Sequence, residues 1–245
     1  MRYRTVDAIR GLTIISMILY HACWDLVYLA GMDFPFYRGK AGFLWQQSIC
    51  MTFILVSGFS AGLGSHPVRR GLVVSLWGLV VTAVTMVFLP EERIVFGILT
   101  FLGSAMLITG ACQNGLDRLA PLWGLIGSGL LFVLWYPVNR GYLAMGTLWI
   151  ALPQTWYADG VATYLGFMEP GFFSTDYFSL LPWLFLFWAG YFLCRLLRQR
   201  SQLGLLEREL CPPLGWLGRH SLVCYLLHQP VLYGLLQCAW LFGRR

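Results

Sequence analysis

Charged side chains are scarce in this sequence. They make up 11% of its 245 residues, whereas a typical soluble domain carries about 25%. Hydrophobic residues account for 58% and aromatic residues for 16%. This balance excludes an ordinary soluble globular protein. It predicts an all-α membrane protein, a polytopic helix bundle with about seven transmembrane helices in a single domain over residues 1–245.

Lysine is nearly absent as well. Lys40 stands beside sixteen arginines, and the formal net charge is +6. A basic balance can attract nucleic acid, but these arginines lie in short stretches between apolar runs. Membrane topology and contacts with anionic head groups explain them better. We therefore expect membrane lipids and no nucleic acid among the partners, and we leave self-association into a homo-oligomer open.

Paired cysteine spacings are missing too. The seven cysteines are scattered, mostly inside apolar runs, and no CxxC pair occurs. The sequence also lacks a P-loop and a dinucleotide-binding fingerprint. A disulfide framework and a zinc site are not indicated, so we expect no metal.

Long apolar segments are what the sequence has instead, each close to the ~20 residues that cross a bilayer. The predicted spans are Arg4–Ala30, Ala41–Gly64, Arg70–Leu89, Ile94–Cys112, Leu119–Tyr136, Tyr177–Leu197 and Leu222–Leu241. The first follows basic residues as a signal peptide does, but its length and the later spans favour an uncleaved span. In the second, Gly58 and Gly62 are spaced for close helix packing.

The interval between the fifth and sixth spans, Val138–Thr175, is rich in glycine, proline and aromatic residues. Its apolar core, Tyr142–Leu152, is too short to span and is predicted to be interfacial or re-entrant. Treating that core as a span would move the arginine-rich stretch 195–219 to the outside, against the positive-inside rule. The basic residues thus predict a cytoplasmic N-terminus.

The first span carries four ionisable residues that an apolar helix should avoid: Asp7, Arg10, His21 and Asp25. At about 100° per residue, Arg10 and His21 differ by only ~20° around a helix, and both aspartates fall within about 60° of them. At ~1.5 Å per residue, the stripe from Asp7 to Asp25 covers about 27 Å, close to the thickness of a hydrocarbon core. Because intramembrane ionisable groups are costly, this stripe is the leading functional candidate.

His21 is the candidate general base, because a neutral imidazole accepts a proton at physiological pH. Asp25 follows at the i,i+4 spacing and could orient that ring. The structural alternative is a histidine that is satisfied by Asp25 or a backbone carbonyl and holds helices together. Asp7 and Arg10, three positions apart, either bind a ligand or form an ion pair at the membrane interface.

Further candidates lie elsewhere in the chain. His228 stands in the last span before Gln229 and Pro230, where a proline frees a carbonyl; the alternative is a kink with a packing histidine. Gln46 and Gln47 give the second span a polar side. Asp176, before the sixth span, binds a substrate or caps a helix. The arginines at 69, 70, 195, 198 and 219 form a cytoplasmic rim, which reflects topology or recognises phosphate.

Three segments together resemble a superfamily of membrane-bound acyltransferases. Arg10 and His21 match the arginine and histidine of its first span, and FILVSGFSAGL (53–63) resembles an element of its next span. LGRHSLVCYLLHQPVL (217–232) resembles its closing element through Ser221, Tyr225, His228 and Pro230. The opening and the DYFSLLPWLFLFWAGYFL stretch (176–193) are most similar to bacterial relatives of the heparan-α-glucosaminide N-acetyltransferase catalytic domain.

The resemblance implies transfer of an acetyl or other acyl group from cytoplasmic acyl-CoA to a sugar or other polar acceptor, in a bacterial inner membrane. His21, with Asp25 and His228, is then the catalytic set. The predicted acyl-CoA contacts are Arg10, Arg69, Arg70 and Arg219, and the predicted acceptor contacts are Asp7, Gln46, Gln47 and Asp176. The competing hypothesis is a proton-coupled transporter that uses the charged stripe of the first span as a relay.

Overall fold

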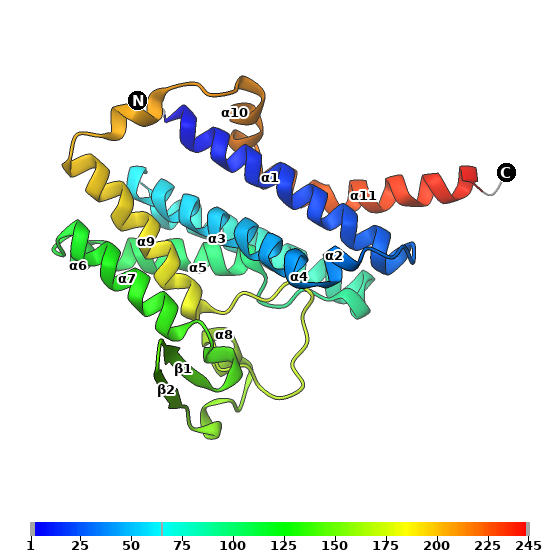
Figure 1. The fold of residues 1–245 in the computed structure, drawn as a ribbon, viewed down its shortest axis with the longest axis horizontal. Coiled ribbons are helices and arrows are strands. Elements are labelled where there is room, and N and C mark those ends of the chain that lie inside the picture. The colour runs from blue at the N-terminus through cyan, green and yellow to red at the C-terminus, as the bar shows by residue number, and fades with distance from the viewer. Residues whose placement is uncertain (1–2, 65, 244–245) are drawn as a thin grey trace. The chain divides into compact units, whose positions relative to one another are not determined.

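A computed structural model describes residues 3–64 and 66–243 and confirms the all-α polytopic prediction (Figure 1). The helices are α1 (Arg4–Trp24), α2 (Pro35–Arg38), α3 (Lys40–Leu63), α4 (Pro67–Phe88), α5 (Ile98–Ala111), α6 (Gln113–Leu116), α7 (Pro121–Trp135), α8 (Gly160–Leu165), α9 (Leu180–Gln199), α10 (Pro212–Arg219) and α11 (Ser221–Gly243). One antiparallel hairpin, β1 (Tyr142–Met145) and β2 (Leu148–Ala151), interrupts them.

Six helices of the described chain are long and apolar enough to cross a membrane. They are Arg4–Leu29, Lys40–Leu63, Pro67–Phe88, Pro121–Arg140, Leu180–Gln199 and Ser221–Ala239. The remaining predicted span, Ile94–Cys112, corresponds to α5, which has 14 residues. At ~1.5 Å per residue α5 covers about 21 Å, less than a hydrocarbon core. The protein is therefore an integral membrane protein that has, besides these six candidate spans, a shorter apolar helix.

The chain divides into two compact units, with one boundary inside α3 and the other directly after α9. The first unit comprises Met1–Val56 and Arg200–Arg245, and the second comprises Ser57–Gln199. The first therefore joins α1, α2 and the beginning of α3 to α10 and α11. The second contains the end of α3, the helices from α4 to α9, and the hairpin.

In the first unit, α1 and α10 approach each other through glycines (Figure 1). A Cβ atom at Gly11 would lie 2.0 Å from the carbonyl oxygen of Leu214, and one at Gly218 would lie 1.9 Å from that of Asp7. Both distances are far below van der Waals contact, so a side chain at either position would force the helices apart. The two glycines thus hold α10 against the first half of α1.

In the second unit, glycines serve the same purpose around α9. A Cβ at Gly58 would lie 1.9 Å from the carbonyl oxygen of Phe187, and one at Gly62 would lie 2.9 Å from Cβ of Cys194. The predicted close packing of this small-residue pair is therefore confirmed. On the other side, Gly124 of α7 faces the ring of Phe192, so α9 is the most enclosed of the candidate spans.

The long interval after α7 is ordered by its own hydrogen bonds. Asp159 caps α8 by accepting a bond from the Ala162 N–H at 2.8 Å. The Tyr177 hydroxyl donates to the carbonyl oxygen of Thr163 at 2.6 Å, and burial raises the pKa of Tyr177 to about 12. The segment predicted as interfacial or re-entrant, Tyr142–Leu152, forms the β1–β2 hairpin.

The glycine contacts between α1 and α10 predict a stability effect. Gly11→Leu and Gly218→Leu should each destabilise the protein, because overpacking typically costs about 1–3 kcal/mol. Apparent melting temperature in detergent, measured by fluorescence-detected gel filtration, checks this. Gly234→Leu in α11 is the matched control, since no atom lies within 4 Å of its added Cβ. Equal melting temperatures for all three variants would contradict the close approach.

Candidate functional site

The charged stripe of α1 faces α10 and α11 within the first unit. At its beginning, an oxygen of Asp7 lies 3.6 Å from Nη1 of Arg10, so the predicted i,i+3 ion pair forms. The same Nη1 lies at 3.5 Å from the carbonyl oxygen of Gly218, to which it donates a long hydrogen bond. Arg10 therefore pairs with Asp7 and also contacts the end of α10, beside the glycine that permits the approach.

Further along the stripe, His21 meets His228 of α11. Their ring centroids are 4.7 Å apart with an angle of 62° between the planes, and the Tyr20 ring lies edge-on to His21. Nδ1 of His228 is 2.5 Å from the carbonyl oxygen of Tyr225. Because a carbonyl only accepts, Nδ1 carries the proton, and the lone pair is left on Nε2. That Nε2 is buried and has no hydrogen-bond partner among the described residues.

Asp25 closes the stripe and is only 3% exposed. It begins a π-helical segment, Asp25–Leu29, that continues α1. Such segments occur frequently at functional sites. Asp25 Oδ1 accepts a hydrogen bond of 2.7 Å from Nε2 of Gln229. The hydrogen bond of this carboxylate therefore runs to the neighbouring helix, whereas the sequence suggested an orienting contact with His21.

Gln229 was not among the predicted site residues. With its amide nitrogen directed at Asp25, its Oε1 is buried without a partner in the described part of the chain, as is Oδ2 of Asp25. Pro230 follows immediately inside α11 and lacks an N–H, so the carbonyl of Leu226 loses its helical donor. The position of a glutamine next to a predicted histidine was the signal in the sequence that could have identified it.

A cluster of aromatic rings, the aromatic wall of Tyr20, Tyr37 and Trp45, lies beside His21 in the same unit. The Tyr20 ring contacts the rings of Tyr37 and Trp45 at centroid distances of 4.8 and 5.3 Å. The Trp45 indole donates to Oγ of Ser16 at 2.8 Å and so ties the beginning of α3 to α1. Gln46 and Gln47, the predicted acceptor contacts, follow Trp45 in α3 and are half-buried. Sequence reasoning missed the wall because an aromatic residue in a span is usually a lipid or core residue.

The predicted acyl-CoA contacts fall into both units. Arg10 and Arg219 belong to the first, whereas Arg69 and Arg70 belong to the second, and all but Arg10 are exposed. Asp176 also belongs to the second unit, where its Oδ2 accepts the N–H of Ile98 at 3.0 Å. Of the two interpretations left open for this residue, capping is observed, and the capped helix is α5 rather than the adjacent α9.

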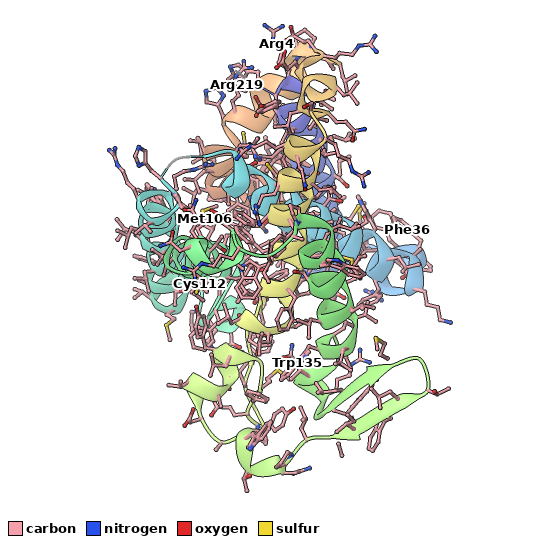
Figure 2. The ribbon with its side chains drawn as sticks, turned by 90° about the vertical axis from the view of Figure 1, so that its left-hand side faces the viewer. Arg4, Phe36, Met106, Cys112, Trp135 and Arg219 are labelled. Carbon is pink, nitrogen blue, oxygen red and sulfur yellow. The ribbon has the colours of Figure 1, made fainter. Side chains whose placement is uncertain are left out.

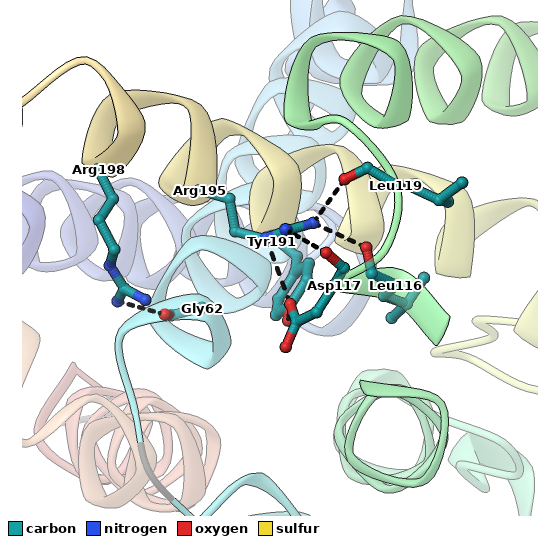
Figure 3. Close-up of polar contacts among 7 residues, drawn as sticks. All are labelled: Gly62, Leu116, Asp117, Leu119, Tyr191, Arg195 and Arg198. Atoms are coloured by element: carbon teal, nitrogen blue, oxygen red, sulfur yellow. Dashed lines mark hydrogen bonds and ion pairs between the residues drawn. The ribbon is translucent and has the colours of Figure 1, made fainter. Parts of the chain in front are cut away.

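Arg195 and Arg198 of α9, which the sequence placed on the basic rim, bind backbone carbonyls (Figure 3). Arg195 donates to the carbonyl oxygens of Leu116, Asp117 and Leu119 at 2.7–3.0 Å. Its Nε also lies 3.3 Å from Oδ1 of Asp117. These contacts clamp the turn between α6 and α7 onto α9.

The same corner of the second unit contains a hollow. Arg198 donates to the carbonyl oxygen of Gly62 at the end of α3, at 2.7 Å, and the Tyr191 hydroxyl donates to Asp117 Oδ1 at 2.7 Å (Figure 3). The hollow, about 250 Å³ in volume, is lined by these residues and by Gln113. Because both arginines are engaged by carbonyls at helix ends, their contacts indicate a structural role.

Two other kinds of catalytic centre receive no support. Gly58–Gly62 reads GFSAG and matches the GxSxG pattern of serine hydrolases, but it lies inside the continuous helix α3. A nucleophile elbow requires a strand-to-helix turn that exposes its serine, and here Ser60 is buried. No group of three histidine, cysteine, aspartate or glutamate residues that could hold a metal ion is found in the described ranges.

The Asp25–Gln229 contact predicts a further stability effect. Gln229→Leu would leave a buried carboxylate with no partner on either oxygen, which should cost about 1–3 kcal/mol or more. Gln237→Leu, a half-buried glutamine further along α11, is the matched control. The double variant Asp25→Leu/Gln229→Leu should recover part of the loss, because it removes both ends of the bond. The apparent melting temperatures of the wild type, of these three variants and of Asp25→Leu alone test this, and additive effects of the Asp25 and Gln229 changes would refute the contact.

The family model described as Heparan-alpha-glucosaminide N-acetyltransferase, catalytic, matches residues 2–230. Searches of curated proteins and of solved structures give no significant match. The matched region includes α1, α10 and α11 as far as Pro230, and so contains His21, Asp25, His228 and Gln229. The chain belongs to the heparan-alpha-glucosaminide N-acetyltransferase catalytic-domain family.

Proposed function

We propose that this protein is an integral-membrane acetyltransferase that moves an acetyl or other acyl group from acyl-CoA to a sugar or other polar acceptor. Family membership supports transferase activity in general. It does not favour the transporter hypothesis that the charged stripe also allowed. The finer assignment of acyl-CoA as donor, a polar acceptor and His21 as base is part of the proposal, and the His21–Asp25–His228–Gln229 cluster supports its acceptor and base.

The observation that carries the proposal is a set of three buried atoms without partners in the described chain. They are Oδ2 of Asp25, Oε1 of Gln229 and Nε2 of His228. Buried polar atoms in proteins are nearly always hydrogen-bonded, so such a set calls for a ligand or water. All three are acceptors in the observed arrangement, and their complement is a group that donates hydrogen bonds. The hydroxyl or amine hydrogens of a polar acceptor provide such donors.

The reaction can be written with these residues. His21 takes the proton from the acceptor hydroxyl or amine, and the freed lone pair attacks the thioester carbonyl carbon. A carbon–oxygen or carbon–nitrogen bond forms, the carbon–sulfur bond breaks, and the CoA thiolate leaves and recovers a proton. His228, in ring contact with His21, completes the pocket, and Asp25 attracts the positive charge that develops on the imidazole. In the covalent variant, His21 itself carries the acetyl group between donor and acceptor.

For the residues that contact acyl-CoA and the acceptor, we propose the same residues that the sequence predicts. Arg10, Arg69, Arg70 and Arg219 are the proposed contacts for the phosphates of acyl-CoA, because guanidinium groups bind phosphate in a bidentate manner. Asp7, Gln46, Gln47 and Asp176 are the proposed acceptor contacts, Asp176 in addition to its bond with Ile98. The proposed location is a bacterial inner membrane with the N-terminus in the cytoplasm. Acyl-CoA is the proposed co-substrate, and no metal is invoked.

Labelled acetyl-CoA tests the function directly. Purified protein in nanodiscs, given acetyl-CoA with a labelled acetyl group and a panel of amino sugars and polyols, should transfer label to an acceptor. His21→Gln should lower kcat by about 10²–10⁴-fold, the usual contribution of general acid–base catalysis. His220→Gln is the matched control, because His220 is exposed at the end of α10. Label on wild-type protein in the absence of acceptor would identify the covalent variant.

The outcomes separate the hypotheses. Full transfer by His21→Gln would eliminate His21 as the base. Protein that neither binds nor turns over acetyl-CoA would refute the acetyltransferase. In that case, proton-coupled uptake into proteoliposomes would be the next measurement, again with His21→Gln against His220→Gln.

A further inference from the structure

We propose that the β1–β2 hairpin lies in the head-group region of the bilayer leaflet that the end of α7 reaches, with Trp149 as its anchor. The occupant of its apolar surface is lipid rather than a protein partner. This inference is independent of the acetyltransferase reaction, since it concerns a segment that contributes no residue to the proposed site.

The hairpin is apolar and uncharged. Residues 141–158 contain no aspartate, glutamate, lysine or arginine. Trp149 is 63% exposed, and Met145, Leu148 and Ile150 are exposed as well. An exposed hydrophobic strand edge in water is a site of aggregation, so a hairpin of this composition requires a cover.

Both faces of the hairpin consist of apolar side chains. The register pairs Ala144 with Trp149 and Met145 with Leu148 across the Gly146–Thr147 turn, where Gly146 has a φ of +61°. On one face the Tyr142 and Trp149 rings contact each other at 5.7 Å. On the other face the side chains are aliphatic. A water-exposed antiparallel pair normally alternates apolar with polar residues, and this alternation is missing here.

The position of the hairpin continues a lipid-facing surface. It begins two residues after the candidate span Pro121–Arg140, and β1 packs against α7. Trp123 of α7 is 71% exposed, as expected for a side chain that faces acyl chains. Figure 2 shows the hairpin extending sideways from the end of α7 near Trp135 instead of prolonging the helix. The apolar surface of α7 therefore continues onto the hairpin, which in this proposal lies parallel to the membrane plane.

Two constraints determine the depth. The exposed apolar side chains would be unfavourable in bulk water, so the hairpin does not lie there. The outer edges of a two-stranded sheet carry unpaired N–H and C=O groups, which are too costly to bury in the hydrocarbon core. The hairpin therefore does not lie in the core either. The head-group region is the one layer that offers apolar contact and hydrogen-bonding partners together. Tryptophan and tyrosine are enriched there because their rings are apolar and their N–H and O–H groups are polar.

Fluorine NMR of the full chain in nanodiscs tests this placement. Biosynthetic 5-fluorotryptophan labels all eleven tryptophans, and the resonance that disappears in Trp149→Phe belongs to Trp149. Lipids with a nitroxide near the head group report contact with the bilayer surface, and a soluble paramagnetic chelate reports contact with water. Trp123, assigned through Trp123→Phe, is the lipid-facing reference. A tryptophan introduced as Gln202→Trp is the water-facing reference.

The proposal expects the lipid nitroxide to broaden the Trp149 resonance at least twofold more than the soluble chelate does. The reverse order would place Trp149 in water and overturn the proposal. Insensitivity to both agents would mean that protein covers the hairpin, and it would also overturn the proposal. If the remaining resonances shift in Trp149→Phe, the more conservative Trp149→Tyr supplies the assignment.

Discussion

The core of a bilayer offers no water, so each polar group that a spanning helix carries inward must be satisfied within the protein. Much of the structure follows from this constraint. The indoles of Trp45 and Trp188 donate to hydroxyl groups on neighbouring helices, Ser16 and Thr109. The guanidinium of Arg195 donates hydrogen bonds to the backbone carbonyls at and after the end of α6. The three acceptors left without a partner at Asp25, Gln229 and His228 are therefore informative; among the described residues the Tyr37 hydroxyl is a further buried side-chain atom without one.

Glycine is the means by which the helices come close enough for such contacts. Within the first unit, Gly11 and Gly218 each admit a backbone carbonyl of the other helix. Within the second, Gly58 admits the carbonyl of Phe187 and Gly62 admits the side chain of Cys194, both on α9. In each case the missing side chain lets backbones and short polar side chains meet, which drives helix association where the hydrophobic effect between helices is weak.

Periodicity and spacing predicted much of the fold and part of the site. The spans were predictable because their apolar length is imposed by the bilayer, and the stripe from Asp7 to Asp25 because a continuous helix fixes which residues share a side. His228 was found through its proline. Gln229 was missed because an amide has no distinctive spacing and its importance depends on which helix lies opposite. The hairpin was missed because a short apolar run has no period that separates strand from helix.

The arginines show why one feature of a sequence can carry two meanings. Their bias toward one side of the membrane was sufficient to predict an orientation, and it suggested a phosphate-binding rim. In the structure, Arg195 and Arg198 bind carbonyls at helix ends, a favourable place for a cation in the field of the helix dipole. Topology, helix capping and ligand binding all favour arginine at the same depth. The contacts of each guanidinium group distinguish these roles, which composition cannot do.

The π-helical segment at Asp25–Leu29 has a consequence for the length of the chain. A π turn accommodates one residue more than an α turn over the same stretch, and it behaves as a one-residue insertion. The residues that follow the inserted position within Asp25–Leu29 are therefore rotated by about 100° relative to an unbroken α-helix. In this chain Val27 is buried and Tyr28 is exposed. A relative shorter by one residue here would keep its carboxylate in place while presenting different side chains to the following loop, so gaps at this point of an alignment carry structural meaning.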